Sequence, residues 1–124
     1  MGQGGSERGR RAHIAGAAAE EIAIRAYLDR GYTLAETRWR CPHGEIDLIL
    51  RNGAQVIFAE VKSSATRDKA AARITAGQMQ RVMASASVFL DGEPQGQLTD
   101  VRLDVVLVWG VGEVEILENA YGHG

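Results

Sequence analysis

Apolar and polar residues alternate along two neighbouring stretches in the first half of this chain. Residues 45–51 (EIDLILR) and 54–62 (AQVIFAEVK) show the two-residue period of β-strands. Asn52-Gly53 lies between them, and an Asn-Gly pair flanked by alternating residues is a strong signal for a β-hairpin. A shorter strand is predicted just before the hairpin, at 32–38. The pattern therefore predicts three consecutive strands.

Two longer stretches have helical character. Residues 14–30 are rich in Ala and carry an apolar stripe at helical spacing, and Gly31 is a typical C-terminal stop. Residues 70–90 have helical composition without Pro, although Gly77 weakens the middle by roughly 1 kcal/mol relative to Ala. We therefore expect one helix before the three strands and one after them.

The rest of the chain predicts two more strands. Residues 91–94 (DGEP) end the second helix, and strands are expected at about 101–109 and 112–117. The order of elements is then α-β-β-β-α-β-β. No internal repeat or interdomain linker interrupts this order, and 124 residues fit one domain. The sequence predicts a single α/β domain.

Alternation also assigns the side chains of the central hairpin to faces. On the first strand, one face carries Glu45, Asp47 and Ile49. The opposite face is uninterruptedly apolar and is expected to form core: Ile46, Leu48 and Leu50. On the second strand, one face carries Val56, Phe58, Glu60 and Lys62.

The turn decides which of these residues lie opposite one another. A two-residue turn at the Asn-Gly pair places Asp47 across from Phe58, whereas a four-residue loop over 52–55 places Asp47 across from Glu60. Both registers keep Asp47, Glu60 and Lys62 on one face, with Cβ separations of about 5–8 Å. We therefore expect a small group of charged side chains on this hairpin.

Two carboxylates on neighbouring strands repel each other, and an unpaired carboxylate in an apolar segment is costly. A divalent cation would offset this cost, because Mg²⁺ binds a few carboxylates together with waters. An ion pair between Glu60 and Lys62 is the alternative, although it leaves the second carboxylate in excess. Spacing alone leaves both interpretations open.

Charge and composition narrow the class of protein. The net charge is −2, but residues 1–81 hold 13 of the 14 Lys and Arg residues, a distribution that allows a basic face. The single cysteine excludes an internal disulfide, and no apolar run is long enough to span a bilayer. Residues 1–13 are expected to be a flexible leader without a signal-peptide pattern, so we expect a cytoplasmic protein without a membrane partner.

The same residues resemble known signatures. Asp47 followed by Glu60-Val61-Lys62 resembles the D…(D/E)-x-K signature of the restriction-endonuclease-like superfamily. Three longer segments resemble the YraN-type family of small bacterial proteins, which is similar to archaeal Holliday-junction resolvases: GEIDLI (44–49), FAEVK (58–62) and RLDVV (102–106). The resemblance covers about residues 16–121. It implies a restriction-endonuclease-like core, αβββαβ, with a central mixed β-sheet flanked by helices, in a nuclease-like domain over 14–121.

The resemblance also implies roles for individual residues. Asp47 and Glu60 would hold Mg²⁺ or Mn²⁺, with the backbone carbonyl of Val61 as a candidate further ligand, and Lys62 would orient or activate the attacking water. Glu20 matches the first-helix glutamate of the family and would be an outer or third carboxylate. Its neighbour Glu21 has Arg25 four residues along the helix as an ion-pair partner, whereas Glu20 has Ile24 there.

The implied function is that of a metal-dependent endonuclease acting on structured or branched DNA. The alternatives are a non-catalytic nucleic-acid-binding module on the same fold and a protein-interaction domain that uses the acidic C-terminal half. Paired cuts in a symmetric junction would favour a homodimer, as the resolvase-like relatives suggest.

Several basic and polar side chains are candidates for contacts with backbone phosphates, which supply most non-specific affinity. They are Arg38, Arg40, Arg67, Lys69, Arg73 and Gln78. For any single arginine a solvated surface position is the alternative. Gln78 stands where the family more often has Lys, and Ser64 where Arg is usual, so substrate binding departs further from the family pattern than the metal site. Glu45 is expected to pair with Arg40 or Arg38, and the alternative is an outer position near the metal. Asp104 is expected to pair with Arg102 or to help shape the site.

Overall fold

The computed structural model of the chain describes residues 16–120, and the strands in this part form one five-stranded mixed sheet. Their spatial order is β1-β2-β3-β4-β5. The bounds are Thr33–Cys41 for β1, Gly44–Asn52 for β2, Gln55–Ser64 for β3, Val101–Trp109 for β4 and Glu113–Leu117 for β5. The expected leader over 1–13 lies outside the described residues.

Strands β3 and β4 are parallel, and the other neighbouring pairs are antiparallel. A parallel pair needs a long crossover connection. Helices α3 (Arg67–Ala71) and α4 (Ala76–Leu90) and the short 3₁₀ helix η1 (Gly96–Leu98) supply this connection.

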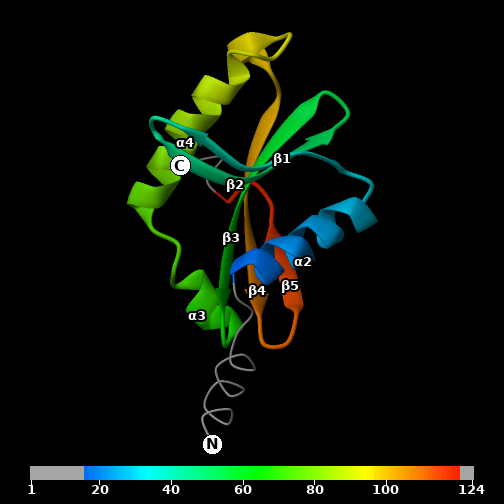
Figure 1. Cartoon of the computed structure of the whole chain (residues 1–124), viewed down its shortest axis with the longest axis vertical. Helices are drawn as coiled ribbons and strands as arrows, with labels where there is room; N and C mark the ends of the chain where they lie inside the picture. The colour runs from blue at the N-terminus through cyan, green and yellow to red at the C-terminus, as the bar shows by residue number, and fades with distance from the viewer. Residues whose placement is uncertain (1–15, 121–124) are drawn as a thin grey trace, which may run out of the picture.

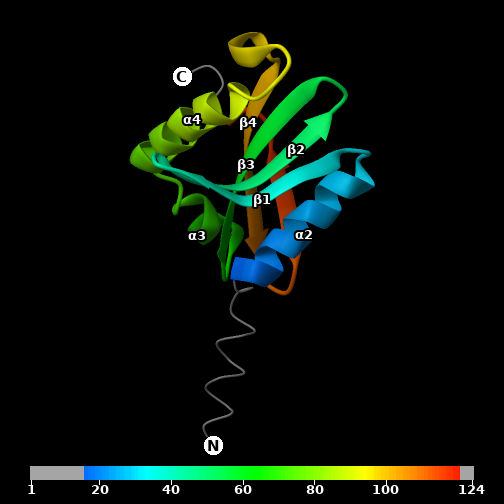
Figure 2. The ribbon, with the colours of Figure 1, turned by 45° about the horizontal axis from the view of Figure 1, so that its top comes forward.

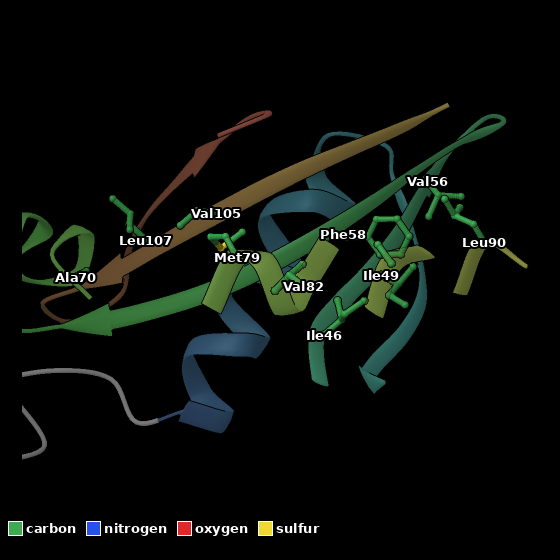
Figure 3. Close-up of a cluster of buried hydrophobic side chains, with 11 residues drawn as sticks. Ile46, Ile49, Val56, Phe58, Ala70, Met79, Val82, Leu90, Val105 and Leu107 are labelled. Carbon is green, nitrogen blue, oxygen red and sulfur yellow. The ribbon is translucent and has the colours of Figure 1, made fainter. Parts of the chain in front are cut away.

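Helices cover both faces of the sheet (Figures 1 and 2). Helix α2 (Gly16–Asp29) packs on one face, where its Ala19, Ala23 and Tyr27 join a buried cluster. Helices α3 and α4 pack on the other face and contribute Ala70, Met79 and Val82 to a second cluster, shown in Figure 3. The predicted single α/β domain with a mixed sheet flanked by helices is confirmed.

The end of α2 follows the sequence prediction. Tyr32 N–H donates to the carbonyl of Tyr27, and Gly31 N–H donates to the carbonyl of Leu28, which together form a Schellman motif. Gly31 has φ +89°, a left-handed conformation that glycine adopts without a steric penalty. The rings of Tyr27 and Tyr32 pack beside this turn, with centroids 5.5 Å apart. Gly31 therefore stops α2 as expected.

The predicted single helix over 70–90 is wrong. The chain forms two helices here, α3 and α4, separated at residues 72–75. The break has a local cause, because the hydroxyl of Thr75 accepts a hydrogen bond from Gln78 N–H and caps the start of α4. Gly77 consequently lies in the first turn of α4 and not in the middle of a long helix.

The predicted β-hairpin is confirmed, and the structure selects its register. Arg51 pairs with Val56 and Leu48 with Ala59, as expected for the four-residue loop. The turn itself is tighter than that loop, because Asn52 still pairs with Gln55. Strand β1 also extends further than predicted, to Cys41.

The predicted facing of β2 is wrong at its first half. Leu48 and Leu50 pack toward α2, but Ile46 packs with Ile49 in the cluster beneath α4, so the alternation breaks between Ile46 and Leu48. Figure 3 shows Ile46 and Ile49 in this same cluster. Because helices cover both faces, an apolar residue is buried on either side, and the sequence pattern cannot reveal the break.

Among the described residues, no helix is both long and apolar enough to cross a bilayer.

Candidate metal centre

The candidate site lies where β2 separates from β3. The last paired residues are Leu48 and Ala59, so the next positions outward are Asp47 and Glu60. Strand β1 is irregular at the same level, since Thr37 pairs with Leu48 while the next residue, Arg38, takes a positive φ of +49°. The sheet is thus locally distorted around Asp47.

Backbone amides hold both carboxylates in place. Val61 N–H donates to Asp47 Oδ2 at 2.8 Å, and Asp47 N–H donates to Glu60 Oε2 at a longer 3.4 Å. Lys62 Nζ lies 4.0 Å from Glu60 Oε1, the outer limit for an ion pair. The structure therefore brings Asp47, Glu60 and Lys62 together, and the lysine neutralises Glu60 only weakly.

Burial makes this arrangement costly. Only 3% of Glu60 is exposed, and its pKa is raised to about 7 by burial first and by the negative charge of Asp47 second. The positive charge of Lys62 opposes this rise without cancelling it. Burial also raises the pKa of Asp47, which the hydrogen bond from Val61 partly offsets. The charge of Lys62 thus lowers the pKa of both carboxyl groups without offsetting the effect of their burial.

The donor set fits a hard divalent cation better than a structural zinc ion. Residues 16–120 contain no group of three or more His, Cys, Asp or Glu side chains placed to hold a metal. Structural zinc needs four protein ligands, whereas Mg²⁺ is commonly held by one or two carboxylates and keeps several waters. Asp47 and Glu60 would supply the two carboxylates that Mg²⁺ needs, and the carbonyl of Val61, next to Glu60 on β3, would be a further ligand.

Glu20 lies beside the centre but is bound to another residue. Arg38 Nε donates to Glu20 Oε1 at 2.9 Å. The partner thus comes from β1, which the spacing along α2 could not show. The negative charge of Glu20 nevertheless contributes to the raised pKa of Asp47.

The predicted phosphate-contacting residues do not gather on one surface free of acids. Arg38 binds Glu20, Arg40 Nε donates to Glu45 Oε1 at 2.9 Å, and Arg67 binds Glu115. The predicted pairing of Glu45 with Arg40 or Arg38 is confirmed, with Arg40 as the partner.

The other three candidates lie on or beside α3 and α4. Arg73 Nη1 donates to the carbonyl of Ser63 at the end of β3, and the side chain of Gln78 is half-buried in the first turn of α4. Lys69 is exposed on α3, and no ion pair involves it within residues 16–120. Lys69 is therefore the candidate whose charge is most available to a ligand.

A second buried acid anchors α2 to the sheet. Asp104 on β4 is fully buried and accepts hydrogen bonds from Tyr27 Oη at 2.7 Å, from Nε and Nη2 of Arg102 and from Asn119 N–H. The predicted pair of Asp104 with Arg102 is confirmed. Tyr27 was not singled out from the sequence, although a buried tyrosine hydroxyl normally needs a partner. Because Tyr27 lies on the same helix as Glu20, this network fixes the helix that carries Glu20.

This chain is similar in sequence to several known bacterial proteins. It is 75% identical over 124 residues to a UPF0102 protein of Ruegeria sp. (strain TM1040), with 100% of both chains covered. It is 53% identical over 119 residues to a UPF0102 protein of Ruegeria pomeroyi, covering 96% of this chain and 97% of the relative. A UPF0102 protein of Dinoroseobacter shibae is 43% identical over 112 residues, covering 90% and 84%.

The sequence model of the uncharacterised protein family UPF0102 matches residues 19–108, a range that includes Glu20, Asp47, Glu60 and Lys62. The YraN-type family indicated by the sequence motifs is this same family. The chain therefore belongs to the uncharacterised protein family UPF0102.

Proposed function

We propose that this protein is a Mg²⁺- or Mn²⁺-dependent endonuclease that hydrolyses phosphodiester bonds, with structured or branched DNA as its substrate class. The observation that carries the proposal is the pairing of Asp47 with the buried Glu60 at the point where β2 leaves β3. Two such carboxylates repel each other, and one lysine, with its Nζ 4.0 Å from Glu60 Oε1, leaves an excess negative charge that a divalent cation would neutralise.

Each residue would have a distinct role. Asp47 and Glu60 would hold the cation, which supplies Lewis-acid polarisation of a phosphoryl oxygen and lowers the pKa of bound water. Lys62 is largely buried, with 13% of its side chain exposed, and its ammonium group would orient the attacking water and offset charge on the phosphate. The hydrogen bond from the Val61 amide holds the Asp47 carboxylate in one orientation, so the position of this candidate metal ligand does not depend on a freely rotating side chain.

The chain order of the elements supports a restriction-endonuclease-like core. Helix α2, strands β1 to β3, the helical crossover and strand β4 follow one another as αβββαβ, and the candidate residues lie on the central hairpin. The exposed Lys69 and the nearby Arg73 follow β3 directly and would contact backbone phosphates. The homodimer stays a prediction, because the structure describes one chain.

A cleavage assay tests the proposal. Linear, flapped and four-way DNA would be incubated with Mn²⁺ and either the natural protein or Asp47→Asn, which keeps an oxygen for the Val61 amide and removes the charge. We expect the natural protein to cut at least one substrate and the variant to lose at least about 100-fold in rate, since one removed electrostatic group costs this much in other enzymes.

Asp29→Asn is the matched control, because Asp29 is an exposed acid at the end of α2 and lies outside the site. It should cut like the natural protein. A protein that binds Mn²⁺ but cuts none of these substrates would contradict the proposal. DNA retardation with steep salt dependence and no products would favour the binding module instead.

A further inference from the structure

Arg38 has an unusual backbone conformation next to the candidate centre. Its φ of +49° lies in the left-handed region, which is uncommon for a residue with a side chain. A non-glycine residue in this conformation is strained, and such residues cluster at functional sites. Thr37 and Trp39 on either side still pair with β2, so the strain is confined to Arg38.

The guanidinium group of Arg38 lies near several acidic side chains. Its Nε donates to Glu20 Oε1 at 2.9 Å, and this bond is the main reason that its pKa is raised. The negative charges of Glu45 and Asp47 add to the same effect. The positive charge of Arg38 therefore interacts with acidic residues of both α2 and β2, including Asp47, one of the two candidate metal ligands.

The two partners differ in their freedom to move. The side chain of Glu20 is 17% exposed, whereas that of Arg38 is 52% exposed. The arginine can turn outward into solvent, while Glu20 is held on a helix that the Tyr27–Asp104 bond anchors to the sheet. Guanidinium groups bind phosphate through paired, charge-assisted hydrogen bonds. A backbone phosphate is thus a natural competitor for Arg38.

We propose that Arg38 is a positioning residue that holds Glu20 away from the metal centre until a phosphate group draws the guanidinium outward. Glu20 then becomes available as the third carboxylate, so that the complete metal site forms only with substrate present. This inference rests on the proposed function, because it assumes a cation at Asp47 and Glu60.

Calorimetric titration with Mn²⁺ alone tests whether Arg38 withholds Glu20 from the metal. Arg38→Gln should bind Mn²⁺ about fivefold more tightly than the natural protein, because the exposed ion pair no longer competes for Glu20. Arg30→Gln is the control, since Arg30 lies just after α2, binds Glu118 in an exposed ion pair, and neither residue belongs to the centre. It removes the same charge and should change the affinity less than twofold.

Glu20→Gln separates a released ligand from a simple loss of positive charge. In the Arg38→Gln background it should return Mn²⁺ affinity to about the natural value, whereas in the natural background it should have less than a twofold effect. Arg38→Gly provides a second variant that relieves the backbone strain, and it should bind Mn²⁺ as Arg38→Gln does.

Sulfate, a mimic of the phosphate group, tests whether a phosphate draws Arg38 away from Glu20. Adding it should tighten Mn²⁺ binding to the natural protein but not to Arg38→Gln, because coupling between two sites requires the residue that links them. Equal effects of sulfate on both proteins would overturn the inference.

Different results would overturn the role of Arg38 and the metal-dependent function. Mn²⁺ binding that is lost in Asp47→Asn but identical in Arg38→Gln, Arg30→Gln and the natural protein would overturn the role of Arg38 alone. An absence of Mn²⁺ binding in every variant would overturn the proposed function and this inference together.

Discussion

Glu60 shows how a single buried group links stability to pH. Its pKa is about 7 in the folded protein against an ordinary 4.5, so between these values the folded state binds more protons than the unfolded state. The free energy of unfolding therefore falls as pH rises through this window, by about 3 kcal/mol in total. The cost is greatest above pH 7, where Glu60 is charged beside Asp47 and no metal is bound.

Replacing Glu60 with Gln should remove this pH dependence in metal-free protein. We expect Glu60→Gln to be more stable than the natural protein at pH 8, and the difference to shrink or reverse at pH 5, where Glu60 is protonated. Urea unfolding at pH 5 and pH 8 measures this difference in the free energy of unfolding. Glu36→Gln, at an exposed position of β1, should follow the natural protein. Parallel pH curves for Glu60→Gln and the natural protein would show that Glu60 titrates normally.

At the scale of elements, the crossover between β3 and β4 depends on where α4 begins. Thr75 sets that point through its hydrogen bond from Gln78 N–H at 3.1 Å. Helix α4 then places Met79 and Val82 against the sheet beneath the central hairpin (Figure 3). A helix that continued from α3 without this cap would change the facing of these residues.

Thr75→Ala should therefore destabilise the protein by about 1 kcal/mol, the usual cost of losing an N-cap side chain. Thr75→Ser keeps the hydroxyl and should cost less than about half as much. Thermal unfolding monitored by circular dichroism distinguishes the two variants. An alanine variant as stable as the serine variant would mean that the cap contributes nothing.

In the whole molecule, charges separated along the sequence are mixed in space. Arg30 binds Glu118, Arg51 binds Glu93 and Arg67 binds Glu115, so basic residues of the first part of the chain pair with acids of the last part. The acidic C-terminal half is therefore partly neutralised, which weakens the case for a protein-interaction domain built on it.

The sequence was sufficient for the strands and the turns, but the local cap at Thr75, which divides the predicted second helix, was missed. Alternation predicted the strands and the hairpin, because the strand period and the turn determine which residues pair. Asp47 approaches Glu60 as predicted, although the alternation breaks between Ile46 and Leu48. The sequence also predicted the stop at Gly31. These features needed no knowledge of what packs on the sheet.

Features that depend on distant segments could not be predicted in this way. The facing of Ile46 changes because both sides of the sheet are covered, and Glu20 binds Arg38 because α2 lies near β1 in space. The bond from Tyr27 to Asp104 likewise joins residues 77 positions apart. Each of these contacts is set by tertiary packing and has no local signal.

Crystals soaked in Mn²⁺ at pH 8, where Glu60 is deprotonated, test the metal centre most directly through anomalous scattering. We predict one strong peak about 2.1 Å from a carboxylate oxygen of Asp47 and from one of Glu60, with waters completing an octahedral shell. A map without a peak between these residues, in which Lys62 has closed on Glu60 as a direct ion pair, would contradict the proposed metal centre.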